Sequence, residues 1–193
     1  MRYPMSHLRI NRSGIKSSKF FSFTSDARGT TAIEFGMVAL PFLMFAFGIM
    51  GTGLHFFTQN SLEHAVESTA RKIRTGQAQQ SGTTINEFKQ LLVSEAGSMI
   101  DASKLQVHLQ TGAEWTDVSP VGCTDSSGTQ TTGTGSSGDA IGQHAGGAGE
   151  VVMVTVCYEW ALAQSMPFLQ YGNMANGSAM IQASTTFRTE PYE

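Results

Sequence analysis

The chain has 193 residues, which is enough for one membrane helix and one modest folded domain. Its net charge of −3 at pH 7 hides an uneven distribution. Residues 1–28 carry six of the twelve Lys and Arg residues, whereas the chain from Thr58 onward carries six basic and thirteen acidic residues. An acidic remainder of this kind argues against nucleic-acid binding, so we expect no nucleic-acid partner.

The first segment, residues 1–29, is rich in Ser, Arg and Lys and has no sustained apolar pattern. A basic flank before an apolar helix stays in the cytoplasm, so we predict a basic cytoplasmic leader here and export of the remainder. A secretory signal peptide is the rival interpretation. It would have a shorter apolar region followed by a small-residue cleavage site, which the sequence GTGLHFF does not offer.

The next segment reads as a membrane span. Twenty consecutive residues without charge run from Phe35 to Leu54, and about 20 such residues cross a bilayer core of about 30 Å. We therefore predict a transmembrane helix over residues 30–57. Pro41 removes one backbone donor inside it, which predicts a kink or local loosening. Glu34 stands at its entrance, where a carboxylate is costly and typical of a functional position.

We expect the helix to continue past the membrane to about Thr75 as an amphipathic stem. Apolar and small residues recur there at three- and four-residue spacing: Leu62, Ala65, Val66, Thr69, Ala70 and Ile73. Gly48 and Thr52 form a small-xxx-small pair, which permits close packing with a partner helix. The sequence leaves open whether these small residues serve that purpose or are incidental.

The exported part, residues 58–193, is predicted to be an α+β domain. A second helix is expected over 84–99, with Thr84 as N-cap and Glu87 completing a capping box. Alternation and β-branched runs predict strands near 105–110, 150–160 and 178–188. The connecting segments are expected to be a loop at 77–82, an exposed, flexible Gly/Ser/Thr loop at 121–149 and an apolar connector at 165–172. The fold class is therefore α+β: a long N-terminal membrane-spanning helix, continuing as the stem, packs on a small antiparallel sheet with a second helix.

Two cysteines, Cys123 and Cys157, permit one disulfide in an exported domain. The bond would close a loop of about 35 residues and stabilise the fold by roughly 3–4 kcal/mol in the chain-entropy model. Free thiols and a metal site are the alternatives, although no C-x-x-C or clustered His supports a metal. No convergent nucleophile, base or metal set appears, so we expect no catalytic residues, no cofactor and no enzyme activity.

The residues around Glu34 resemble the cleavage site of type IV prepilins, because Gly29 lies five residues before that glutamate. The longer string GTTAIEFGMVALPFLMFAFGI is similar to the TadE-like family of tight-adherence (Tad) pilus assembly proteins. The shared pattern is a small-residue start, the dipeptide EF, an apolar run, and a proline seven residues after the glutamate, where Pro41 stands. A polar helix with small residues and an arginine follows in that family, as SLEHAVESTARKIR does here, and the final FRTEPY also looks TadE-like.

The resemblance implies a pseudopilin-like component of Tad (Flp) pilus biogenesis that acts by helix packing. A prepilin peptidase would cut between Gly29 and Thr30, leaving Glu34 at the fifth mature position. We expect Glu34 and Phe35 to act in assembly, with Glu34 pairing with the Thr30 amine of a neighbouring subunit.

The implied partners are the peptidase, other pilins or pseudopilins, Tad inner-membrane assembly proteins and the lipid bilayer. The implied location is the bacterial inner membrane, crossed once, with the N-terminus cytoplasmic and the C-terminal domain periplasmic. Entry into the fibre stays open. The alternative is an uncleaved membrane-anchored adhesin or envelope binding module.

Overall fold

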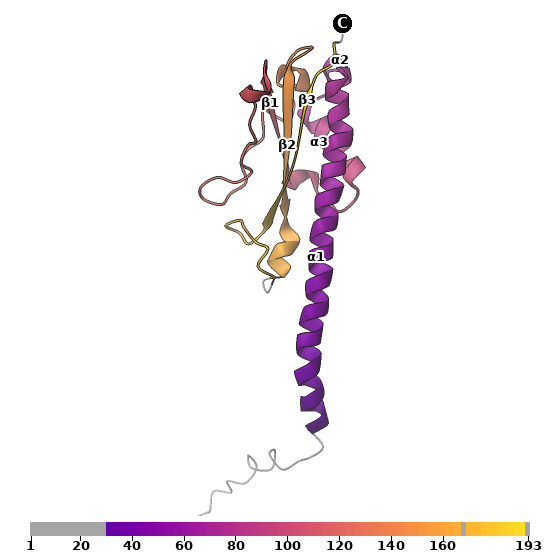
Figure 1. Cartoon of the computed structure of the whole chain (residues 1–193), viewed down its shortest axis with the longest axis vertical. Coiled ribbons are helices and arrows are strands. Elements are labelled where there is room, and N and C mark those ends of the chain that lie inside the picture. The colour runs from indigo at the N-terminus through magenta and orange to yellow at the C-terminus, as the bar shows by residue number, and fades with distance from the viewer. Residues whose placement is uncertain (1–29, 167–168, 192–193) are drawn as a thin grey trace, which may run out of the picture. The chain divides into compact units, whose positions relative to one another are not determined.

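The computed structural model describes residues 30–166 and 169–191 (Figure 1). Contacts divide the chain into two compact units, Met1–Ala46 and Phe47–Glu193. The predicted leader, including Gly29, lies outside the described residues. The first unit is therefore described only from Thr30, and the second contains almost all of the folded structure.

Helix α1 runs from Thr30 to Arg74 and contributes to both units. Its length confirms the predicted continuation of the apolar helix into an amphipathic stem. Basic residues occupy its last turn, where they face the negative end of the helix dipole: Arg71, Lys72 and Arg74. Gly76 then adopts a left-handed conformation with φ 75°, which glycine reaches without steric cost.

A short helix, α2 (Gln77–Gln80), follows at once. The prediction of a plain loop over 77–82 is therefore wrong for its first four residues. The backbone N–H of Gln80 donates to the Gly76 carbonyl, and that of Ser81 donates to the Gln77 carbonyl. A single helical turn of this kind leaves no period in the sequence long enough to detect.

Helix α3 spans Ile85–Ala96 and begins with the predicted capping box. The Thr84 hydroxyl accepts the Glu87 N–H at 3.2 Å, while the Glu87 carboxylate accepts the Thr84 N–H at 2.8 Å. These bonds favour the ionised carboxylate and lower the pKa of Glu87. The helix ends before Gly97, whose φ of 89° does not continue it, three residues earlier than the predicted Met99.

Three antiparallel strands form one sheet in the order β1-β2-β3: β1 Leu105–Gly112, β2 Val151–Trp160 and β3 Ala179–Arg188. The register places Val107 of β1 opposite Val156 of β2, and Val156 opposite Ala183 of β3. Side chains alternate between the two faces along each strand. The sheet with its helices is the α+β arrangement that the sequence predicts.

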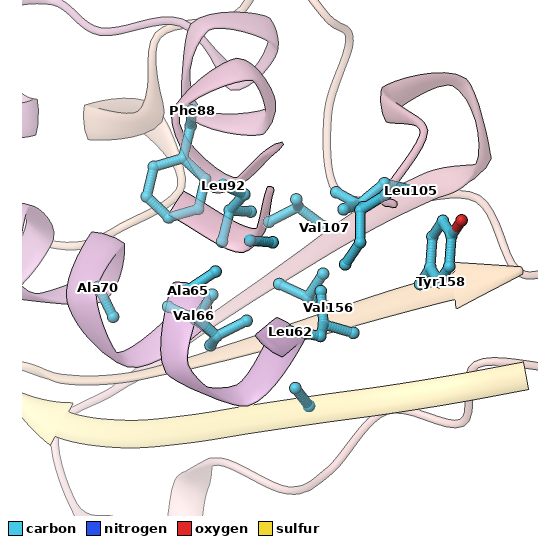
Figure 2. Close-up of a cluster of buried hydrophobic side chains, with 14 of the residues drawn as sticks. Leu62, Ala65, Val66, Ala70, Phe88, Leu92, Leu105, Val107, Val156 and Tyr158 are labelled. Carbon is cyan, nitrogen blue, oxygen red and sulfur yellow. The ribbon is translucent and has the colours of Figure 1, made fainter. Parts of the chain in front are cut away.

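One face of the sheet packs against the second half of α1 and against α3. Figure 2 shows Ala65 and Val66 of α1 near Val156 of β2, with Phe88 and Leu92 entering from α3. The helical spacing that predicts the stem marks the buried face of α1: Leu62, Ala65, Val66, Thr69, Ala70 and Ile73 are all at most 3% exposed. The small members of this stripe let the helix backbone come close to the sheet.

The glycine-rich stretch 121–149 was expected to be exposed, and at three apolar positions this is wrong. Cys123, Ile141 and Ala145 are buried. Cys123 forms the predicted disulfide with Cys157, with Cα atoms 5.5 Å apart. The backbone N–H of Thr134 also donates to the Val107 carbonyl at the edge of β1. The stretch therefore packs along the sheet, while its mobility stays a prediction.

The last described residues fasten the sheet to the end of α1. The backbone N–H of Glu190 donates to the Arg74 carbonyl at 2.8 Å, and the two side chains form an ion pair at 3.3 Å. Thr189 is buried, and its hydroxyl donates to the Gly147 carbonyl at 2.7 Å. Part of the FRTEPY sequence thus satisfies a helix-end carbonyl that lacks an intrahelical partner.

Candidate functional site

The first part of α1 presents an apolar surface with no cover in the described structure. Large side chains on all sides of the helix are about half to three-quarters exposed: Ile33, Phe35, Met37, Val38, Leu40, Phe42, Leu43, Met44 and Phe45. Among the described helices, only α1 is long and apolar enough to cross a membrane, and no residue of its most apolar 18-residue window is buried. A continuous apolar surface of this size marks a contact with lipid or with another protein.

Glu34 is the single charged residue between Thr30 and Leu62 of α1. It is exposed, and no described side chain forms an ion pair or hydrogen bond with it. Residues four apart lie on one face of a helix, so Glu34 follows Thr30 along the same face.

The other predicted positions on this helix are Thr30, Phe35 and Pro41. Thr30 is the first described residue of α1, and Phe35 is 74% exposed beside Glu34. Pro41 lies inside α1, which remains helical on both sides of it. Because Pro41 has no N–H, the Met37 carbonyl has no helical donor. The predicted kink stays a prediction.

The disulfide lies within the second unit. Cys157 lies on the sheet face opposite the helix core, where Gln130 donates to its carbonyl at 3.0 Å. The pair fixes the long loop to β2. Its role in the described structure is to hold the fold together.

Titratable groups of the folded unit serve local structure. Burial and the nearby Lys89 ammonium lower the pKa of His108, whose ring lies 3.3 Å from the Thr131 hydroxyl. Burial lowers the pKa of Lys89 as well, and its ammonium donates to Gln106 at 3.2 Å. Within residues 30–166 and 169–191, no group of three His, Cys, Asp or Glu residues is placed to hold a metal ion.

Where α1 enters the second unit, its glycines contact the chain's own connector. A Cβ placed on Gly51 would lie 2.6 Å from Leu169 Cδ1 and 2.8 Å from Met166 Sδ, and one on Gly48 would lie 3.5 Å from Leu169 Cδ2. Gly53, by contrast, faces open space. Gly48, for which the sequence leaves a partner helix open, and the nearby Gly51 thus accommodate a contact within the chain itself.

An aromatic cluster lies next to this contact, where His55 of α1 meets Trp160 and Tyr171. The His55 ring stacks on Tyr171 with centroids 5.2 Å apart, and it meets Trp160 edge-on, also at 5.2 Å. The hydroxyl of Thr52 hydrogen-bonds to that of Tyr171. The sequence does not predict this cluster, because Trp160 and Tyr171 lie far along the chain from His55 and no local pattern links them.

We expect Gly51→Val to displace the connector, because the added methyl groups would overlap Leu169 and Met166. Both clashing atoms are ends of flexible side chains, so the helix and sheet should remain folded. Faster proteolysis within residues 161–172 of the full chain would report the change. Gly53→Val is the matched control and should leave the cleavage rate unchanged. Equal rates in both variants would contradict the packing described for Gly51.

Comparison with known proteins matches part of the chain to a family model. No curated protein and no solved structure matches the chain. The matched family model is described as TadE-like protein and covers residues 29–71, which include Glu34, Pro41 and most of α1. Less than a quarter of the chain is covered, and the sheet lies outside it. The segment that carries the exposed apolar helix is therefore TadE-like.

Proposed function

We propose that this protein is a pseudopilin-like component of Tad (Flp) pilus biogenesis that acts by helix packing. The observation that carries the proposal is the TadE-like match at residues 29–71, which coincides with the exposed apolar helix. The proposed partners are other pilins or pseudopilins and Tad inner-membrane assembly proteins. The proposal includes a single pass through the bacterial inner membrane, with the basic leader cytoplasmic and the sheet domain periplasmic, and no catalytic activity of its own.

Processing by a prepilin peptidase between Gly29 and Thr30 is part of the proposal. The cut would remove the six basic residues of 1–28, which hold the helix at the cytoplasmic face. It would leave a free amine on Thr30, one helical turn from Glu34. The amine of one subunit and the Glu34 carboxylate of the next would then pair, which lowers the cost of a charge near lipid and sets the axial register of neighbouring helices.

The N-terminus of the membrane-extracted protein tests this proposal. We expect wild-type protein from its native host to begin at Thr30, and Gly29→Leu to accumulate a precursor heavier by about 3 kDa, the share of 29 residues in a 20.7 kDa chain. Gly36→Leu is the matched control, because Gly36 faces open space seven residues further on. It should be processed normally.

Glu34→Gln separates processing from assembly within the same experiment. The variant keeps the shape of the side chain but cannot form an ion pair with an amine. We expect it to insert in the membrane and yet to reduce piliation. A wild-type protein that retains Met1 or Arg2 in piliated cells would overturn the pseudopilin assignment in favour of an uncleaved, membrane-anchored binding module.

A further inference from the structure

We propose that the connector lies in the outer interface of a phospholipid bilayer beside α1; from here on the connector includes the preceding 3-10 helix, and the residues meant are Ala161–Met166 and Leu169. The folded domain would then rest on the membrane through a second contact besides the helix. This inference rests on the proposed function, because it requires α1 to cross the bilayer. It goes beyond that function by assigning a lipid-contacting surface to the sheet domain.

The first argument is position along α1. Met166 and Leu169 pack against Gly51, and Leu169 also reaches Gly48. Both glycines belong to the uncharged run Phe35–Leu54 that reads as the membrane span. The connector therefore lies at the level of the last turns of that run, on the side of the helix where glycine leaves room.

The second argument is length. At 1.5 Å per residue, the run Phe35–Leu54 spans about 30 Å, which matches a bilayer core. A span ending before Gly48 would keep only Phe35–Phe47, about 20 Å on the same rise, which is too short. Extending it toward Thr30 instead would draw the Glu34 carboxylate into hydrocarbon at a cost. Gly48 and Gly51 therefore remain within the bilayer, and the side chains of Met166 and Leu169 that contact them enter it from the outer interface.

The third argument is the chemistry of the connector and its surroundings. The sequence of residues 161–166, ALAQSM, contains no charge. The side chain of Leu162 is apolar and yet 45% exposed. Phe56 and Phe57 of α1 are also more than half exposed just beyond the uncharged run. Tyr171, which is half-buried, stacks on the His55 ring next to Phe56 in the chain, and Tyr is one of the residues enriched at membrane–water interfaces.

The backbone of the connector is compatible with this depth. Ala161–Ser165 forms a 3-10 helix, and the N–H groups of Met166 and Leu169 donate to the carbonyls of Ala163 and Met166 at 3.1 and 3.0 Å. Gln164 is exposed and donates to Ser178 at 2.7 Å. A polar side chain of this kind fits the headgroup layer better than the hydrocarbon centre.

Tryptophan quenching by brominated phosphatidylcholine tests the proposal with the full chain in nanodiscs. The variant Trp115→Phe leaves Trp160 as the single tryptophan, and its emission is the background signal. Adding Leu162→Trp to this variant places one further indole on the connector. Wild-type Trp115 is the matched control, because it is 55% exposed and follows Gly112, which pairs with Val151 at the other end of β2 from Trp160. We expect the indole at position 162 to lose most of its emission and Trp115 to keep its emission.

Phe42→Trp in the same background distinguishes failure of the lipid contact at the connector from failure of the proposed membrane anchoring by α1. A further variant, Gln164→Trp, places an indole at a second position of the connector. If the indole at position 42 is quenched while those at positions 162 and 164 keep their emission as Trp115 does, the connector does not touch lipid and only this inference fails. If the indole at position 42 is itself unquenched, α1 is outside the bilayer and the proposed anchoring fails with it. Resistance of the two cysteines to thiol labelling confirms that each variant is folded.

Discussion

Ala65→Asp should prevent the protein from folding stably. The Ala65 side chain is fully buried on the face of α1 that packs against the sheet (Figure 2). An unpaired carboxylate at such a position costs at least about 3 kcal/mol, a large fraction of the 5–15 kcal/mol that stabilises an ordinary domain. We expect a steep loss of full-length protein in the membrane fraction and, with it, loss of surface pili.

The pH dependence of this variant gives a second measurement. Burial would raise the pKa of the new carboxyl above the value of about 3.9 that Asp has in an unfolded chain. The folded variant then binds more protons than the unfolded one, so its free energy of unfolding relative to wild type should recover as the pH falls toward 4. His64→Asp is the matched control, because His64 is exposed on the same helix. Equal destabilisation by both substitutions would contradict the burial of Ala65.

Removal of the disulfide should have the next largest effect. Cys123 and Cys157 are 34 residues apart in sequence, and opening such a loop costs roughly 3–4 kcal/mol in the chain-entropy model. Replacing both cysteines by serine should therefore lower the urea midpoint of the full chain substantially. Reduction of the wild-type protein should produce a similar loss, whereas reductant should not affect the double variant.

Thiol labelling checks the same bond directly. In the oxidised native protein, neither cysteine should react, and both should react after reduction and unfolding. Labelling of either cysteine without reductant would show that the bond is absent in the cell. An unchanged urea midpoint in the double variant would instead show that packing alone holds residues 121–149 on the sheet.

Features of the fold that depend on nearby residues could be predicted from the sequence. The stripe of Leu62, Ala65 and Val66 repeats at the helical period, so it identifies the buried face of α1 without knowledge of its partner. The capping box of Thr84 and Glu87 is likewise complete within four residues. Strand alternation located all three strands to within a few residues.

Features that depend on distant residues could not be predicted. A glycine-rich composition argues for an exposed loop, yet Ile141 and Ala145 become buried once α2, α3 and β1 lie close by. The contact of Gly51 with Leu169 joins segments that no local pattern relates. Of the candidate site, Glu34, Phe35 and Pro41 were predicted and lie on α1, and an apolar connector at 165–172 was also predicted. The contact of this connector with Gly48 and Gly51 and its aromatic cluster became apparent only from the packing.

The bond between Glu190 and Arg74 has a consequence for the order in which the chain acquires its structure. During synthesis α1 emerges first and β3 last. The Arg74 carbonyl therefore has no hydrogen bond from Glu190 until nearly the whole chain has been synthesised. The contacts that complete the domain are long in sequence, and closing such loops slows folding. A ribosome or translocation channel that stalls before Ala179 would hold a helix with an incompletely covered apolar face, a species suited to capture by chaperones and proteases.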